Sequence, residues 1–164
     1  MTAAHHDDHR AAAFGFSRRR LTAGLILLAG AGALGAAFAA TGGDILSVEE
    51  TLRRVQSNQI TLIDVRSPAE WRQAGIAKGA KTITIHDPLG AAGFVAKVTA
   101  ALAGDLERPV ALICATGVRS RRAERILRRA GVRNVHNVRE GMLGNLRDGP
   151  GWLKRGLPTQ PCDC

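Results

Sequence analysis

The hydrophobic pattern of the chain changes near residue 44, where a long apolar run ends and alternating segments of two kinds begin. One kind is short and continuously apolar or β-branched, as in buried strands. The other kind carries apolar residues at every third or fourth position, as on one face of a helix. The pattern predicts strands over 60–65, 81–85, 110–113 and 132–138, and helices over 47–57, 68–74, 91–102, 121–129 and 141–146.

Two of the predicted helices begin with a capping box, a serine followed three residues later by a glutamate, at 47–50 and 67–70. Strands separated by helices imply an α/β fold, in which a central parallel sheet carries helices on both faces. In such sheets, ligands bind at the carboxyl ends of the strands. Asp64 and Cys114 end two of the predicted strands, so we expect them to line one site.

Residues 1–39 have the order of an export signal. Arginines at 18–20 precede an uncharged run over 21–43, and Ala37-Phe38-Ala39 has the small residues that a signal peptidase reads. The arginines resemble a twin-arginine signal. The alternative is a retained membrane anchor, because the run is long enough to span a bilayer. Both readings place the domain outside the cytoplasm. We therefore expect an exported, periplasmic protein, or an anchored one that contacts the membrane through this leader, with a linker over 40–46.

Composition narrows the function classes. The chain has 164 residues, of which 45% are hydrophobic and 23% charged, which suits one globular domain with an extension. Its formal charge of +9 makes nucleic-acid binding a candidate function. Aromatic residues make up only 4% and tyrosine is absent, so stacking platforms are scarce and no nucleic-acid partner is expected. The histidines and aspartates of 5–9 lie in a leader with no fold to hold ligand geometry, and no metal is assigned.

Cys114 follows an apolar strand and precedes a short loop that leads into a helix beginning near Arg121. Backbone N–H groups at that helix start point towards the sulfur, and the helix dipole favours negative charge there. A thiol so placed becomes a thiolate and a nucleophile. We interpret Cys114 as the catalytic residue. The alternative is a small apolar cysteine that ends a core strand. The loop, which we expect to bind substrate, comprises Ala115, Thr116, Gly117, Val118, Arg119 and Ser120.

Four blocks of the chain resemble the rhodanese family of sulfurtransferases, in the family's order and spacing. They are 62–66 with Glu70-Trp71, 75–80, the Cys114 loop, and 140–142 running to 156–158. The resemblance assigns a rhodanese-like domain to residues 47–160. The second block departs from the family pattern, because Ile76 stands where histidine is usual and Ala77 where isoleucine is usual.

The resemblance implies that sulfane sulfur moves through a persulfide on Cys114, without a cofactor. The donor would be a small anion such as thiosulfate, and the acceptor a thiol, cyanide or a protein that receives the persulfide sulfur. Arg119 contacts the donor, pairs with Glu70, or does both. For Arg66 we favour a pair with Glu70 over substrate contact, and we expect Asp64 to order the site rather than act as a base.

Two rival functions remain open. One is a rhodanese module without turnover, which carries a persulfide or binds a partner. The other is a cysteine-dependent phosphatase, whose nucleophile and arginine are separated by five residues, whereas four separate Cys114 from Arg119. The tail over 161–164 contains Cys162 and Cys164. These two cysteines would accept a persulfide from Cys114, bind a soft metal, form a disulfide, or belong to a frayed terminus.

Overall fold

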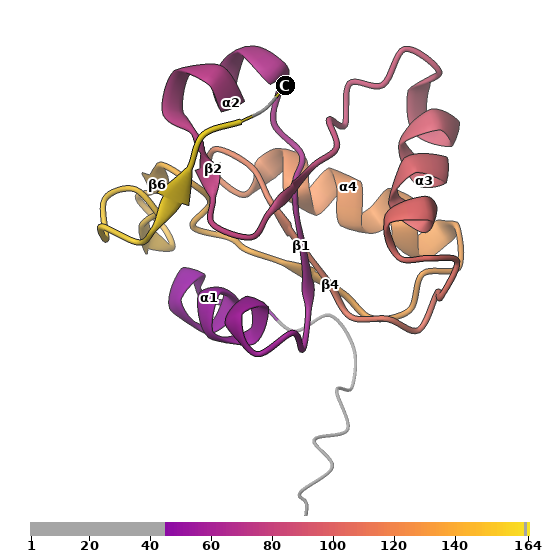
Figure 1. Ribbon diagram of the computed structural model, residues 1–164, viewed down its shortest axis with the longest axis horizontal. Coiled ribbons are helices and arrows are strands. Elements are labelled where there is room, and N and C mark those ends of the chain that lie inside the picture. Colours follow the sequence, from indigo (N-terminus) through magenta and orange to yellow (C-terminus); the bar gives the residue numbers. More distant parts are fainter. Residues whose placement is uncertain (1–44, 163) are drawn as a thin grey trace, which may run out of the picture. The chain divides into compact units, whose positions relative to one another are not determined.

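The computed structural model describes residues 45–162 and 164, and these form an α/β unit (Figure 1). The elements are α1 (Val48–Gln56), β1 (Thr61–Asp64), α2 (Pro68–Ala74), β2 (Ile76–Ala77), β3 (Lys81–Thr82), α3 (Gly90–Ala101), β4 (Val110–Ile113), α4 (Val118–Arg129), β5 (Val135–Asn137), β6 (Gly144–Asn145), β7 (Gly149–Pro150) and β8 (Thr159–Gln160).

The central sheet has four strands in the order β3-β1-β4-β5, and every neighbouring pair is parallel. Because the strands are parallel, their carboxyl ends lie at one edge of the sheet. Asp64 at the end of β1 lies opposite Ile113 at the end of β4, and Cys114 follows directly. The register therefore brings the two predicted site residues to the same edge.

Side chains alternate between the two faces of this sheet and build two cores. Ile63 and Leu112 point into a core that α3 and α4 cover, with Phe94 and Leu127 among its fully buried members. Leu62, Ala111 and Ile113 point into the opposite core, which α1 and the C-terminal segment cover. Figure 1 shows α1 on one side of the strands and α3 and α4 on the other. The predicted α/β fold with helices on both faces is confirmed.

Four predicted elements differ from the structure. The strand expected over 132–138 is observed only over Val135–Asn137. The helix expected near Arg121 begins at Val118, so Arg119 and Ser120 lie in its first turn. The helix expected over 141–146 is absent; Gly141 has a positive φ, and β6 pairs with β7 there in an antiparallel hairpin. The strand expected over 81–85 shortens to Lys81–Thr82.

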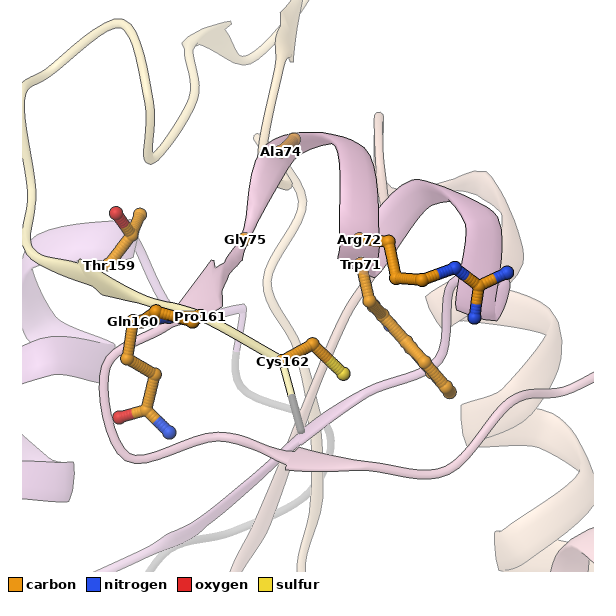
Figure 2. A pocket seen from close by; sticks show the side chains of 8 residues that line it. All are labelled: Trp71, Arg72, Ala74, Gly75, Thr159, Gln160, Pro161 and Cys162. Carbon is orange, nitrogen blue, oxygen red and sulfur yellow. The ribbon is translucent and has the colours of Figure 1, made fainter. Parts of the chain in front are cut away.

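The C-terminal segment returns to the fold through a pairing that the sequence did not predict. β8 runs antiparallel to β2, with Gln160 opposite Ile76. Figure 2 shows Thr159 and Gln160 crossing beside Gly75, at the end of α2. Trp152 is fully buried and its indole N–H donates to the Pro158 carbonyl at 2.9 Å, which fixes the start of this segment.

The predicted signal or anchor over 1–39 lies outside the described residues, as does the linker up to residue 44. Within residues 45–162 and 164, no helix combines the length and the apolar character needed to cross a bilayer.

Candidate active site

Cys114 lies at the carboxyl end of β4, with 1% of its surface exposed. Its sulfur accepts two hydrogen bonds from residues that follow it in the chain. The Gly117 N–H donates at 3.2 Å and the Ser120 hydroxyl at 3.3 Å. Both donors belong to the start of α4, so the sulfur lies where the helix has unpaired N–H groups and a positive dipole end.

The start of α4 is open because its N-cap is Gly117, which has no side chain to cap the helix. Gly117 has a φ of +85°, a conformation that other residues adopt only with strain. A Cβ at this position would lie 2.2 Å from the carbonyl oxygen of Arg139. The turn after Cys114 therefore requires glycine for two independent reasons.

The segment after β5 hydrogen-bonds to the backbone of the Cys114 loop. Met142 N–H donates to the Cys114 carbonyl at 2.8 Å, and the Asn145 side-chain amide donates to the Thr116 carbonyl at 3.3 Å. At Gly141 a Cβ would lie 2.6 Å from the carbonyl oxygen of Cys114. No sequence pattern predicted that Gly141, Met142 and Asn145 support the loop. Glu140-Gly141 belongs to the fourth rhodanese-like block, which was the available signal.

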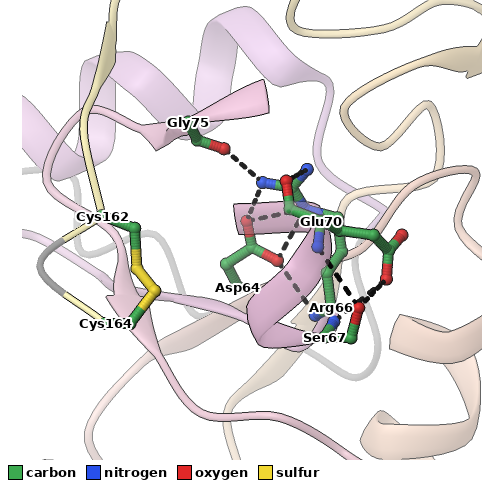
Figure 3. The surroundings of a disulfide bond; sticks show 7 residues. All are labelled: Asp64, Arg66, Ser67, Glu70, Gly75, Cys162 and Cys164. Carbon is green, nitrogen blue, oxygen red and sulfur yellow. Dashed lines mark hydrogen bonds and ion pairs between the residues drawn. A yellow bond between two sulfur atoms is a disulfide. The ribbon is translucent and has the colours of Figure 1, made fainter. Parts of the chain in front are cut away.

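Arg66 and Asp64 form a buried ion pair at the carboxyl end of β1, with side-chain exposures of 2% and 0%. The Arg66 guanidinium donates to both Asp64 oxygens, at 2.7 to 3.0 Å, and to the Gly75 carbonyl at 2.6 Å (Figure 3). The expected pairing of Arg66 with Glu70 is not the one observed, because the adjacent Asp64 side chain takes the guanidinium. Arg66 reaches only the backbone carbonyl of Glu70, at 3.4 Å.

Glu70 instead pairs with Arg119, through two hydrogen bonds of 2.6 Å each. Its carboxylate also accepts the Ser67 N–H and hydroxyl, which completes the capping box of α2. The hydrogen bonds from Arg119 lower the pKa of Glu70 from 4.5 to about 2. Glu70 in turn raises the pKa of the Arg119 guanidinium above its usual range. This ion pair ties the first turn of α4 to α2.

A basic pocket of about 400 Å³ borders the loop at residues 116–118. Arginines supply most of its charge. Arg139 pairs with Asp148 at 3.8 Å, the acidic residue of the pocket. The arginines that line the pocket are Arg121, Arg125, Arg139 and Arg147. Such a surface attracts small anions towards the loop.

Comparison with known proteins identifies the family. The model of the rhodanese-like domain matches residues 47–145, more than half of the chain. The chain belongs to this family. β8 at Thr159–Gln160 lies beyond the matched residues and pairs with β2 within them.

The relatives of this rhodanese-like chain include a sulfur transferase by name. The uncharacterized protein RP600 of Rickettsia prowazekii is 28% identical over 109 residues, 65% of this chain and 87% of that protein. The crystal structure of Rv0390 from M. tuberculosis is 26% identical with a TM-score of 0.56, covering 74% of this chain and 98% of that one. The 30 kDa polysulfide-sulfur transferase homodimer from Wolinella succinogenes is 30% identical with a TM-score of 0.51, covering 74% and 80%.

The rhodanese-like fold brings the sequence-predicted residues together in three groups. Cys114, Gly117 and Ser120 form the sulfur's immediate surroundings. Glu70 and Arg119 form the link to α2, and Asp64 with Arg66 forms the buried support. Ala115, Thr116 and Val118 contribute backbone to the turn, and Val118 is exposed. Over the described residues, no group of three metal-ligating side chains is arranged to hold a metal.

Proposed function

We propose that this protein is a sulfurtransferase that moves sulfane sulfur from a small anionic donor to a thiol or cyanide through a persulfide on Cys114. The observation that carries the proposal is the position of the Cys114 sulfur at the uncapped start of α4, with the Gly117 N–H and the Ser120 hydroxyl directed at it. An anionic sulfur is stabilised by both donors and by the helix dipole.

In the first step, the Cys114 thiolate attacks the outer sulfur of thiosulfate. A Cys114–sulfur bond forms, the sulfur–sulfur bond of the donor breaks, and sulfite leaves with its electron pair. The persulfide carries the negative charge onto its outer sulfur, and backbone N–H groups at a helix start stabilise such an anion. This is covalent catalysis by an activated cysteine.

In the second step, cyanide or a thiolate attacks the outer sulfur of the persulfide. The Cys114 sulfur leaves as a thiolate, and the product is thiocyanate or a persulfide of the acceptor. No proton transfer from a side chain is required, because every attacking and leaving group is an anion.

The charge around the loop supports an anionic donor. Arg121, Arg125 and Arg147 line the basic pocket beside residues 116–118. The Wolinella relative is by its name a polysulfide-sulfur transferase, and polysulfide is also an anion with sulfane sulfur. We infer that Arg119, held by Glu70, contributes its charge to the loop without serving as the donor's main contact.

Thiocyanate formation from thiosulfate and cyanide tests the proposal. We expect parallel double-reciprocal plots, typical of a covalent intermediate. We expect no thiocyanate from Cys114→Ser and an unchanged rate from the matched control Cys162→Ser. Loading of Cys114 with sulfur but no thiocyanate would instead identify a carrier without turnover. Hydrolysis of an aryl phosphate that depends on Cys114 would identify a phosphatase.

We also propose that the domain acts outside the cytoplasm, on the evidence of the arginines at 18–20 and Ala37-Phe38-Ala39. Sequencing the N-terminus of the exported protein tests this proposal. A mature chain that begins at Ala40 is expected, and a chain that stays in the cytoplasm contradicts it.

A further inference from the structure

The fold carries a second sulfur site at its C-terminus. Cys162 and Cys164 form a disulfide, with their Cα atoms 5.3 Å apart. Cys164 is exposed and Cys162 is half-buried, whereas the free Cys114 is buried. An exposed disulfide is open to attack by a thiolate, and such disulfides are the labile or catalytic ones in proteins.

The pair lies beside the supports of the Cys114 loop. Gln160, two residues before Cys162, is joined to β2, and its carbonyl oxygen lies 3.0 Å from where a Cβ of Gly75 would be. The Gly75 carbonyl accepts from Arg66, which in turn holds Asp64 at the end of β1. Figure 3 shows the disulfide next to this network. A short series of contacts therefore joins the pair to the strand end beside Cys114.

Beyond β8, little holds the tail in place. Pro161, Cys162 and Cys164 make no hydrogen bond with the other described residues. Rotation of the backbone after Gln160 therefore moves Cys162 without breaking a hydrogen bond. Cys162 lines a pocket together with Thr82, the last residue of β3, and Thr82 lies opposite Asp64 at the carboxyl end of β1. The movement therefore starts at the end of the sheet where the Cys114 loop begins.

A pocket of about 400 Å³ adjoins Cys162 and has features that suit a small anion. Trp71 and Arg72 of α2 line it together with Gly75 and Cys162 (Figure 2). Trp71 is 4% exposed, and its indole N–H has no hydrogen-bond partner among the described residues. A buried donor without a partner is costly. The Arg72 guanidinium adds positive charge.

We propose that Cys162 and Cys164 are a dithiol–disulfide pair that reduces the sulfane sulfur of the Cys114 persulfide to hydrosulfide within one chain. This inference rests on the proposed function, because it requires the persulfide. It gives the protein a second product, hydrosulfide, and the anion pocket beside Cys162 is where that product first forms.

The proposed steps balance in atoms and electrons. The Cys162 thiolate attacks the outer sulfur of the Cys114 persulfide, and the Cys114 thiolate leaves. The Cys164 thiolate then attacks the Cys162 sulfur, forming the disulfide and expelling hydrosulfide. The two thiolates have given two electrons to the sulfane sulfur. An external dithiol reduces the disulfide and resets the pair. The structure shows the pair in its oxidised form.

A single-turnover experiment on the full chain tests the proposal. The chain is reduced with a dithiol, freed of it anaerobically and mixed with thiosulfate. Hydrosulfide is trapped with a bimane reagent, and the thiols are mapped by mass. We expect wild type to release one hydrosulfide per chain, at a rate independent of protein concentration, and to form the Cys162–Cys164 disulfide. We expect Cys164→Ser to stop with the extra sulfur on the peptide that contains Cys162.

The double variant Cys162→Ser/Cys164→Ser is the control. We expect it to keep its Cys114 persulfide, to release no hydrosulfide and to form thiocyanate as fast as wild type whose C-terminal disulfide is left oxidised. Equal hydrosulfide release from this variant, or a reduced wild type that keeps its persulfide, overturns the proposal while thiocyanate formation still supports the transferase. Failure of every chain to load sulfur or form thiocyanate overturns the proposed function and this inference together.

Discussion

Two helices begin at the carboxyl edge of the sheet, α2 after β1 and α4 after β4, and their first turns are built in opposite ways. At α2, the Ser67 hydroxyl accepts from the Glu70 N–H, and the Glu70 carboxylate accepts from the Ser67 N–H. At α4, Gly117 provides no cap, and the Cys114 sulfur takes the place of the capping acceptor. Where side chains cap a helix start, they take up its unpaired N–H groups and stabilise the helix. Where no side chain caps it, those N–H groups remain available to bind an anion.

Glu70 connects the two helix starts, because it caps α2 and pairs with Arg119 in the first turn of α4. The start of α2, which Ser67 and Glu70 cap (the closed start), thereby positions the uncapped start of α4 at Gly117 (the open start). The comparison predicts that changes at the open start alter sulfur transfer most, that changes at the connection alter it less, and that changes at the closed start alter only stability.

Replacement of Gly117 by alanine is expected to have the largest effect, because it fills the open start. The positive φ costs about 1–2 kcal/mol, and the clash with the Arg139 carbonyl displaces the turn. We expect thiocyanate formation to fall by about a hundredfold. Gly104→Ala is the matched control, since Gly104 also has a positive φ, of +79°, but has no atom within 4 Å of its Cβ position. An equal loss of thiocyanate formation in both variants would contradict a role for the clash with the Arg139 carbonyl.

Asp64→Asn is expected to come next, because it leaves the buried Arg66 without its charge partner. We expect the free energy of unfolding, measured in urea, to fall by about 3–5 kcal/mol. Sulfur transfer falls less than in Gly117→Ala, since Asp64 lies on β1 and hydrogen-bonds to Arg66, whereas the Cys114 sulfur accepts from Gly117 and Ser120. Glu107→Gln breaks an exposed pair with Arg133 and is expected to cost about 0.5 kcal/mol or less.

Glu70→Gln tests the connection and its pH dependence. Glutamine still caps α2 but lacks the charge that Arg119 meets, so we expect a loss of about 0.5–1 kcal/mol at pH 7. The folded pKa of Glu70, about 2, lies below the reference value of 4.5. The stabilisation is therefore complete above pH 4.5 and is lost as the pH falls towards 2.

Urea unfolding of wild type and variant across this pH range measures the difference. The stability gap is expected to close as the pH falls from 4.5 towards 2. Glu50→Gln is the matched control, because Glu50 holds the same position in α1 and pairs with Arg54 away from the site. A gap that stays constant over this range would contradict the assigned ion pair.

Ser67→Ala is expected to have the smallest effect on transfer, because it opens the closed start without touching the sulfur. We expect a loss of about 1 kcal/mol in stability and an unchanged rate of thiocyanate formation per folded chain. Ser47→Ala removes the corresponding cap of α1 and should behave alike. A rate loss in Ser67→Ala comparable to that in Gly117→Ala would remove the distinction between the two starts.

The sequence predicted the strands and helix starts that short stretches of neighbouring residues specify. The β-branched and apolar runs predicted β1 and β4, and the serine at 67 with glutamate at 70 predicted the start of α2. Sequence patterning missed the start of α4 by three residues, because a glycine cap carries no side-chain signal.

Long-range contacts explain the remaining differences. The pairing of β2 with β8 joins residues far apart in the chain, and no local pattern announces it. The partner of Arg66 depended on which carboxylate was already engaged, and Arg119 engages Glu70 from 49 residues away. The hairpin of β6 and β7 replaced a predicted helix because Gly144, with a φ of +86°, pairs with Pro150.

The central claim is that the open start of α4 holds a sulfur that accepts another sulfur. The most direct measurement is the intact and peptide mass of the chain after brief exposure to thiosulfate labelled in its outer sulfur, with the C-terminal disulfide left oxidised. The account predicts a gain of one labelled sulfur, located on the peptide that contains Cys114 and removed by cyanide. An unchanged mass in a folded chain with free Cys114, or label found elsewhere, would contradict it.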